Sequence, residues 1–386
     1  MTVDHASSVP SSPIASTPAG VEGEARSSAS PHPAAPGGAD ASAVKPRTIK
    51  WYVVHARDYK EYNEQLVAFG ARLAEKTNGA LQVEFVYSTI GGGWRDIAAE
   101  RDGYARVMSG EYDVSQLGVD TLGAKVITLP YIFRSYDHAE AVWRGPIGKK
   151  MLDGIAKYTD HKLEALAFSY SGGYRALVGS RPVQRIEDVK GAKVLVEEGL
   201  SPDGELLLEL GANPAVANTE SAPVADRHLG ETVRRVSDLL STGRLELFSV
   251  EINGLAYAEQ FAPINHAPLY ISLTDHTMYA TSIVANRDFL ESLEPALRQV
   301  LAEETRKFAV AERQLSALLA VRNLDAFEKV PGRTVVPVSE ASRRAFRDAA
   351  RVVLRKYPAM AELIKEIHAA GEIPLLATAA TAASPA

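Results

Sequence analysis

Residues 295–330 read PALRQVLAEETRKFAVAERQLSALLAVRNLDAFEKV, and this segment decides the fold. After Pro295 it contains neither proline nor glycine, and apolar residues recur at helical spacing from Leu297 to Leu319. A helix of about 35 residues, rising about 1.5 Å per residue, spans roughly 50 Å, which is longer than one small lobe. The segment therefore predicts a single helix that covers most of residues 295–330 and runs across two lobes.

Shorter helices and strands alternate on the N-terminal side of this segment. Residues 49–54 predict a buried strand, 59–73 carry the apolar face of a helix, and 81–87 alternate apolar with polar residues as a half-buried strand does. The alternation continues to Ala285. Such a succession is typical of layered domains, so we expect an α/β fold.

We expect five segments along the chain, two of which form lobes with cores of their own. They are a disordered tail rich in Pro, Ala and Ser (1–47), a first lobe that includes part of the C-terminal helices (48–170), a second lobe (171–290), the spanning and C-terminal helices with a last helical block at 341–368 (291–370), and a short tail (371–386).

The composition excludes several classes of function. The chain has 386 residues, of which 46% are hydrophobic, and a formal net charge of -6 at pH 7. No run rich in Lys and Arg occurs, which argues against nucleic acid as a partner. The apolar stretches are interrupted by charges, so we expect no membrane span. Because the chain has no cysteine, it forms no disulfide, thiolate metal site or cysteine nucleophile.

The first 43 residues consist mainly of Ser, Ala, Pro and Gly, with scattered charges. Such a composition cannot bury enough apolar surface to fold, so it predicts a disordered tail. A secretion signal requires an apolar run of about 7–15 residues, and none occurs here. This segment therefore predicts that the protein stays in the cytoplasm.

The motifs of common catalytic and cofactor sites are missing from the sequence. The nine histidines are scattered, without the spacing of a metal site. Gly91-Gly92-Gly93 lacks both the Lys-Ser/Thr of a phosphate loop and the spacing of a dinucleotide fingerprint. No G-x-S-x-G nucleophile turn occurs. We therefore expect no cofactor and no metal, assign no catalytic residue, and leave open whether the chain is an enzyme.

Five segments, in the same order along the chain, resemble those of the solute-binding proteins of TRAP (tripartite, ATP-independent) transporters. They are KTNG (76–79), SGEYDV (109–114), LPYIF with DHA (129–139), SRPV with EDVKGAKV (180–194), and LTDH with IVAN and Phe289 (273–289). No single segment is specific, but their order over about residues 48–330 is. The chain resembles a divergent member of the dicarboxylate-binding-protein type.

This resemblance implies a hinged receptor for a small molecule. Its fold would be periplasmic-binding-protein-like, with two α/β lobes joined by hinge strands and by a long helix that spans both. A small organic acid would bind in the cleft, and the lobes would close over it by hinge bending. The partners implied are this small-molecule ligand and the membrane subunits of a transporter.

The resemblance also implies two arginines in the cleft, of which this chain has one. The first, in the strand before SRPV, matches Arg175. The second, the principal carboxylate clamp, lies twenty residues further on, where this chain has Leu195. A guanidinium suits a carboxylate because it is planar and always charged. We therefore expect Arg175 to contact an anionic ligand and Leu195 to face the same space. The alternative role of Arg175 is a structural ion pair between the lobes.

Further residues are candidates for ligand contact, and each has a structural alternative. They are His55 and Arg57 at the end of the first strand, Trp94 after three glycines, Glu251 and Asn253 after a later strand, and His276. The strand-end residues follow from the rule that ligands lie at the carboxyl ends of strands in open α/β sheets. The structural alternatives are ordinary loop residues for His55 and Arg57, a hydrophobic plug for Trp94 and a structural histidine for His276. The ligand-contacting position of the later strand is ambiguous between Ser249, Val250 and Glu251.

Two functions remain open at this point. The first is a binding protein for a small organic molecule, an organic anion held by Arg175. The second is a cytoplasmic enzyme or biosynthetic helper on the receptor scaffold, which would use His55, Glu251 and His276 as general acids or bases. The missing export signal, Leu195 and an insertion at about Thr219–Thr232 favour the second function, whereas the lack of a catalytic constellation argues against it.

Overall fold

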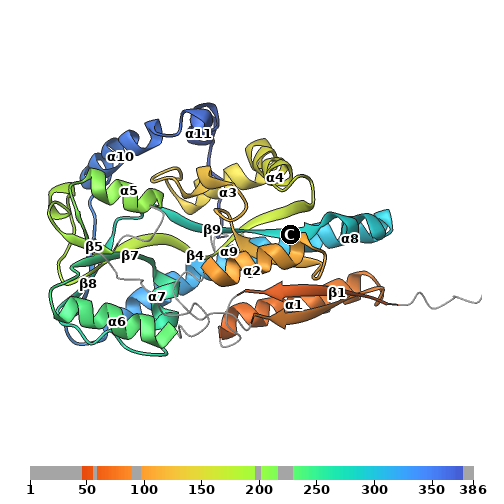
Figure 1. Ribbon diagram of the computed structural model, residues 1–386, viewed down its shortest axis with the longest axis horizontal. Helices are drawn as coiled ribbons and strands as arrows, with labels where there is room; N and C mark the ends of the chain where they lie inside the picture. Colours follow the sequence, from red (N-terminus) through yellow and green to blue (C-terminus); the bar gives the residue numbers. More distant parts are fainter. Residues whose placement is uncertain (1–45, 55–58, 89–96, 196–200, 216–228, 377–386) are drawn as a thin grey trace, which may run out of the picture. The chain divides into compact units, whose positions relative to one another are not determined.

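The computed structural model describes residues 46–54, 59–88, 97–195, 201–215 and 229–376. A mixed sheet has the strand order β2-β1-β3-β9-β4-β7-β5-β6, and β8, with β10 beside it, pairs with β4 (Figure 1). The strands are β1 (Arg47–Val53), β2 (Leu81–Tyr87), β3 (Val114–Gly118), β4 (Leu163–Gly179), β5 (Lys193–Leu195), β6 (Asn213–Ala215), β7 (Leu247–Glu251), β8 (Leu269–Leu273), β9 (Met278–Asn286) and β10 (Arg333–Pro337).

Strand β4 belongs to both lobes. Its first part, from Leu163 to Tyr174, pairs antiparallel with β9, which in turn pairs with β3. Its last part, from Arg175 to Gly179, pairs with β7 and β8. The two-lobed α/β fold with hinge strands is therefore confirmed, and β4 is one of the connections between the lobes.

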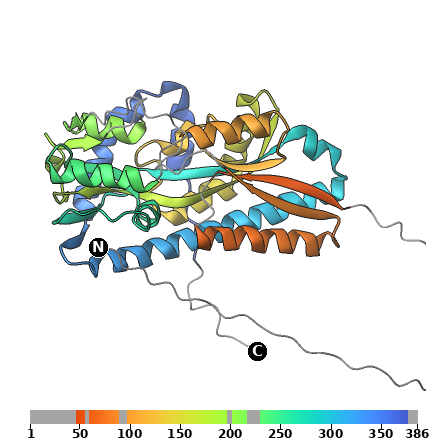
Figure 2. The same ribbon diagram turned by 60° about the horizontal axis from the view of Figure 1, so that its bottom comes forward.

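Helices pack on both faces of the sheet, and Figure 2 shows α1 and α9 side by side on one face with α2 on the other. The helices are α1 (Lys60–Lys76), α2 (Ile97–Met108), α3 (Tyr136–Arg144), α4 (Pro146–Tyr158), α5 (Pro202–Glu209), α6 (Leu229–Ser241), α7 (Ile252–Ala258), α8 (Arg287–Ser292), α9 (Pro295–Glu328), α10 (Glu340–Arg355) and α11 (Ala361–Ala369).

The long helix predicted at 295–330 is confirmed as the single helix α9, Pro295–Glu328. In its first half, Phe308 packs in the core of the first lobe, with its ring centroid 5.8 Å from that of Trp51. Near its end, Phe327 packs in the core of the second lobe with Phe248. The helix therefore contributes apolar side chains to both lobes.

A buried polar network fixes the middle of α9. Arg313 donates to both carboxylate oxygens of Glu140 in α3, with 2.8 Å between Nη2 and Oε2, and to the carbonyl oxygen of Phe168 in β4 at 2.5 Å. The carboxylate of Glu312 accepts from Gln116 Nε2 at 2.9 Å and from the Ser169 hydroxyl. Burial raises the pKa of Glu312 above its usual 4.5. These contacts join α9 to α3, β3 and β4.

Some elements differ from the prediction. The helical block at 341–368 is divided into α10 and α11, because Pro358 lacks an N–H group and disfavours helical geometry at Tyr357, where φ is -116° and ψ is 61°. Helix α7 and strand β10 were not predicted. Each is too short for its apolar period to stand out from the sequence around it.

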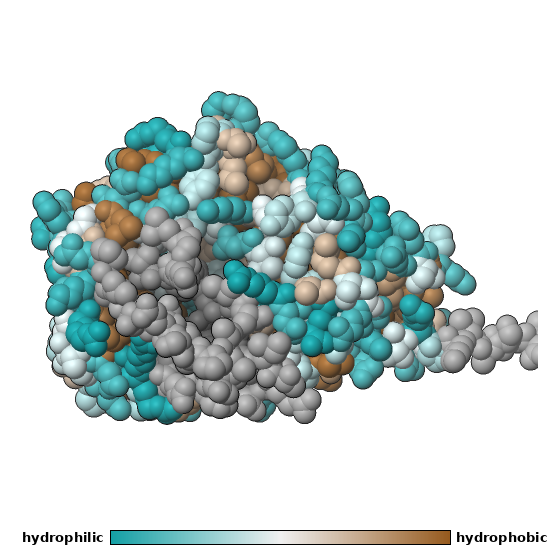
Figure 3. Space-filling model, viewed as in Figure 1, coloured by the Kyte–Doolittle hydropathy of each residue, from teal (hydrophilic) through white to brown (hydrophobic). Residues whose placement is uncertain are grey.

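The surface matches the composition. In the space-filling view of Figure 3, hydrophilic residues cover most of the described face, and hydrophobic ones form small separate groups. Within the described ranges, no helix combines the length and the apolar character that crossing a bilayer demands.

The buried pair of Arg313 and Glu140 predicts a large mutational effect. Arg313→Ala leaves the Glu140 carboxylate buried without its cation, so we expect the free energy of unfolding to fall by about 3–5 kcal/mol. The matched control on the same helix is Arg322→Ala, whose exposed pair with Glu61 contributes less than about 1 kcal/mol. Urea denaturation measures both. Equal losses in the two variants would show that the buried pair does not anchor the helix.

Glu312 predicts a dependence of stability on pH. Because its pKa is raised in the folded chain, the folded state keeps a proton that the unfolded state loses above about pH 4.5. The contribution of Glu312 to stability is therefore complete below that pH and falls as the pH rises through the folded-state pKa. Relative to the wild type, Glu312→Gln should gain stability between pH 4 and pH 7. A difference that stays constant across this range would contradict the raised pKa.

Candidate functional site

Arg175 lies where β4 changes its pairing partner, directly opposite Glu251 of β7. The register of β4 against β9 shifts between Ser169 and Gly173, and Gly173 has a φ of 73°. A Cβ atom at Gly172 would lie 2.2 Å from Cγ of Glu251. The two glycines therefore let β4 bend and pass close to the Glu251 side chain.

The Arg175 side chain is buried, 3% exposed, between two carboxylates. Its Nη2 atom lies 3.2 Å from Oε2 of Glu251, and its Nη1 atom lies 3.5 Å from Oδ2 of Asp203. Nη1 also donates to the carbonyl oxygen of Ser249 at 3.3 Å. The Nη2 group makes no hydrogen bond of good geometry within the described ranges. The charge of Arg175 is thus compensated by two carboxylates, whereas its Nη2 group, although close to Glu251, makes no well-aligned hydrogen bond among the described residues.

His276 joins the same network through Ser249. The Ser249 hydroxyl donates to Oδ2 of Asp203 at 2.9 Å and lies 3.0 Å from Nε2 of His276, while Nδ1 of His276 lies 2.8 Å from the Thr274 hydroxyl. Because the single hydroxyl proton of Ser249 is directed to Asp203, Nε2 of His276 donates to Ser249 and Nδ1 accepts from Thr274. In this tautomer His276 does not act as a base toward Ser249, so the pair is not an activated nucleophile.

A small cavity lies beside Arg175, between residues of the two lobes. Its volume is about 10 Å³. The side of the first lobe is formed by Asp120 and Thr128, and the side of the second by the start of α5 with Asp203. The start of β9 closes it, and there the Thr277 hydroxyl is buried without a hydrogen-bond partner in the described part of the chain. Such a space holds about one water molecule.

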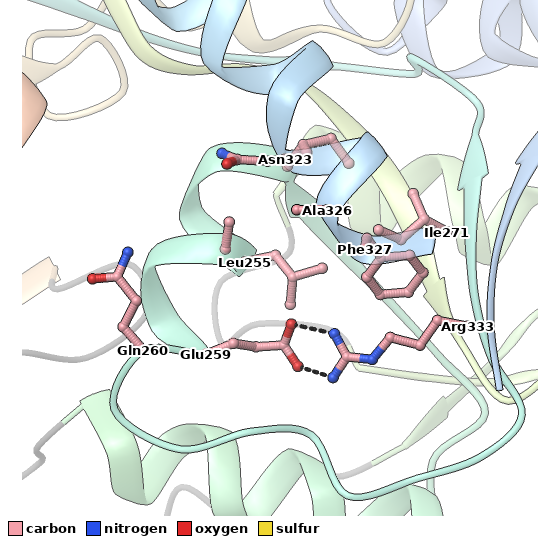
Figure 4. Close-up of a pocket in the computed structure, with 10 residues that line it drawn as sticks. Leu255, Glu259, Gln260, Ile271, Asn323, Ala326, Phe327 and Arg333 are labelled. Carbon is pink, nitrogen blue, oxygen red and sulfur yellow. Dashed lines mark hydrogen bonds and ion pairs between the residues drawn. The ribbon is translucent and has the colours of Figure 1, made fainter. Parts of the chain in front are cut away.

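A larger cavity of about 230 Å³ lies on the second lobe, between α7, the end of α9 and β8 (Figure 4). The Arg333 guanidinium on its wall is paired with both carboxylate oxygens of Glu259, at 2.5 and 2.7 Å, and lies over the Phe327 ring. This guanidinium already makes a bidentate pair with a carboxylate, so fewer of its N–H groups than those of Arg175 can bind an anionic ligand. The cavity beside Arg175 is therefore the candidate site.

The structure brings three of the predicted residues together, since Arg175, Glu251 and His276 share one network through Asp203 and Ser249. Asn253 lies in the first turn of α7, and its amide donates to the Ser316 carbonyl at 2.8 Å and accepts from Asn323 at 3.0 Å, so it connects α7 to α9. His55, Arg57, Trp94 and residues 219–228 of the insertion lie outside the described residues.

Leu195 packs against the core of the second lobe with Phe248, and the described residues around the small cavity do not include it. The sequence offered no sign of Asp203. A carboxylate just after Ser201-Pro202 is typical of a helix start, and α5 begins at Pro202. The Asp203 carboxylate comes close to Arg175 only because α5 packs against β4 and β7.

Comparison with known sequences gives a family match. The chain matches the sequence model of the bacterial extracellular solute-binding proteins, family 7, over residues 53–220 and 262–359. A solute-binding protein of Chromohalobacter salexigens is 26% identical over 271 residues, which cover 68% of this chain and 71% of that protein.

Solved structures share the fold at low identity. A TRAP periplasmic solute-binding protein from Ochrobactrum anthropi has a TM-score of 0.68 and 21% identity, covering 84% of this chain and 95% of that one. A second, from Pseudomonas putida F1 with bound D-glucuronate, has a TM-score of 0.65 and 22% identity, covering 86% and 99%.

These matches contradict the predicted cytoplasmic location. The matched family is extracellular, and the similar structures are those of periplasmic proteins. The prediction rested on the composition of residues 1–43 and on Leu195, and it is wrong. The alternative of a cytoplasmic enzyme loses its main argument with it and finds no support in the geometry of Ser249 and His276.

The contact between Gly172 and Glu251 predicts a steric effect. Gly172→Ala would place a methyl group against the Glu251 side chain, so we expect a loss of about 1–3 kcal/mol in the free energy of unfolding. The control is Gly154→Ala in α4, where no atom lies within 4 Å of the added Cβ, and there we expect a gain of about 0.5–1 kcal/mol. Thermal denaturation compares the two, and a stabilised Gly172→Ala variant would disprove the close approach.

Proposed function

The chain belongs to family 7 of the bacterial extracellular solute-binding proteins, the receptors of TRAP transporters, and on this premise we propose that Arg175 captures the carboxylate of a small organic acid in the cleft between the lobes. The observation that carries this proposal is a buried guanidinium on a cavity wall with one donor group, Nη2, that makes no hydrogen bond within the described ranges.

The chemistry of the wall suits one carboxylate. Arg175 and Thr277 both line the small cavity, and Nη2 of Arg175 and the Thr277 hydroxyl are buried donors without a hydrogen bond in the described part of the chain. A charge-assisted contact of this kind in a closed cleft contributes on the order of 2–5 kcal/mol, which is roughly 30-fold to several thousand-fold in affinity. Glu251 and Asp203 hold the guanidinium in place, and His276 orients Asp203 through Ser249.

Ligand entry requires the cleft to open. A cavity of about 10 Å³ is far smaller than an organic acid, and its walls belong to different lobes. The lobes therefore separate to admit the ligand and close over it, with β4 among the strands that bend. His55, Arg57 and Trp94 stay predicted contacts, and residues 48–170 and 171–290 stay the proposed lobes, with their boundary inside β4.

The solved structure from Pseudomonas putida F1 holds D-glucuronate, an organic acid with one carboxylate. We extend this class of ligand to the present chain and propose that the loaded receptor delivers it to the membrane subunits of a transporter. No feature of the described residues favours an enzyme over this function.

Loss of Arg175 tests the proposal. For any small carboxylate that the wild type binds, D-glucuronate being the first to try, Arg175→Ala should weaken the affinity by roughly 30-fold to several thousand-fold, as measured by isothermal titration calorimetry. Arg181→Ala is the matched control, because Arg181 lies on the same lobe in a half-exposed pair with Glu246. If both variants bound as the wild type does, Arg175 would serve only as a structural ion-pair partner.

A further inference from the structure

Among the described residues around the candidate site, carboxylates outnumber cations. Two carboxylates, Asp120 and Asp203, line the small cavity, and a third, Glu251, pairs with Arg175. Among the described residues that line the cavity, Arg175 is the sole Lys or Arg. The formal charge of these four groups is therefore -2, from one guanidinium and three carboxylates.

The two carboxylates on the cavity wall have different partners. Asp203 is buried and accepts from the Ser249 hydroxyl, with Arg175 at 3.5 Å. Asp120 is exposed and accepts from the Thr128 hydroxyl at 2.9 Å, and within the described ranges it has no ion pair within 4 Å. Among the described residues, Asp120 therefore adds a negative charge to this wall that no ion pair within 4 Å compensates.

This excess disfavours a ligand that brings two negative charges. One carboxylate can approach Nη2 of Arg175 and the Thr277 hydroxyl, but a second would meet Asp120 or Asp203, and like charges in a closed cleft repel strongly. The position of a second clamping arginine holds Leu195, which packs against an apolar core.

We propose that the ligand is a zwitterion with one carboxylate and one cationic nitrogen. Its carboxylate contacts Nη2 of Arg175 and the Thr277 hydroxyl, and its cationic group faces Asp120 and Asp203. This inference rests on the proposed function, because it places the carboxylate at Arg175. It adds a second, acidic half to the site, which selects the charge at the other end of the ligand.

The test uses sets of three acids on a common carbon skeleton. One set is succinate, 4-hydroxybutyrate and 4-aminobutyrate, and further sets vary the chain length and the position of the amine. The full chain is equilibrated with the pooled acids and separated by gel filtration, and the retained acids are quantified by mass spectrometry. Within each set that is retained, we expect the retained amount of the amino acid to exceed that of the dicarboxylate and that of the hydroxy acid about 10-fold or more.

Variants of Asp120 and Asp203 test whether these carboxylates cause the preference for the amino acid. Asp120→Asn and Asp203→Asn should each reduce the ratio of amino acid to dicarboxylate about 10-fold. Asp120 is exposed, so its variant keeps the test valid if Asp203→Asn folds poorly. Asp153→Asn, an exposed position on α4, is the control and should leave the ratio unchanged.

The outcomes separate the two claims. Retention of dicarboxylates or hydroxy acids in preference to amino acids, or a preference that survives both site variants, overturns the zwitterion and leaves a carboxylate receptor. Failure to retain any acid of any set overturns the proposed function as well.

Discussion

Strand β4 imposes the constraint on which the rest of the structure depends, because one continuous strand pairs with β9 in the first lobe and with β7 and β8 in the second. The change of partners occurs between Tyr174 and Arg175. Gly172 and Gly173 just before it permit the bend, since a side chain at either position would collide with Glu251 or Tyr136. The residue proposed to capture the ligand therefore lies at a connection that also transmits movement between the lobes.

Helix α9 is the second connection, and it is held in a different way. Its ends are anchored by apolar packing in each lobe, whereas its middle is anchored by the charged pair of Arg313 with Glu140 and by Glu312. Buried ion pairs demand a fixed geometry, because their stabilisation depends on good hydrogen bonds. We infer that the middle of α9 moves with β3, β4 and α3, and that bending on closure occurs toward the second lobe.

Local features of the fold could be predicted from the sequence, whereas contacts between distant segments could not. The length of α9 followed from a segment without Pro or Gly. Asn78-Gly79, whose φ values are 49° and 79°, are likewise a local signal that ends α1. The position of Arg175 on a strand followed from the resemblance. The meeting of Asp203 with Arg175 did not, because it depends on how α5 packs. The ligand-contacting position of β7 stays a prediction, but the alternation of a strand turns Ser249 and Glu251 to the same side, where their side chains contact Asp203 and Arg175.

This limit of sequence-based prediction also explains why the predicted cytoplasmic location is wrong. The packing of a core, the pairing of strands and the burial of Arg175 obey the same physics in either compartment, so the site carries no mark of where it works. Leu195 packs against the core of the second lobe, and this position says nothing about the compartment.

The central claim is that the lobes close on a carboxylate held by Arg175, and a distance measurement between the lobes tests it most directly. Because the chain has no cysteine, spin labels can be placed at Lys149→Cys in α4 and Asp238→Cys in α6 alone. Double electron–electron resonance should give a broad distribution of distances without ligand and a narrower, shorter one with a saturating carboxylate, and Arg175→Ala should abolish the change. The same distribution with and without bound ligand would contradict the account.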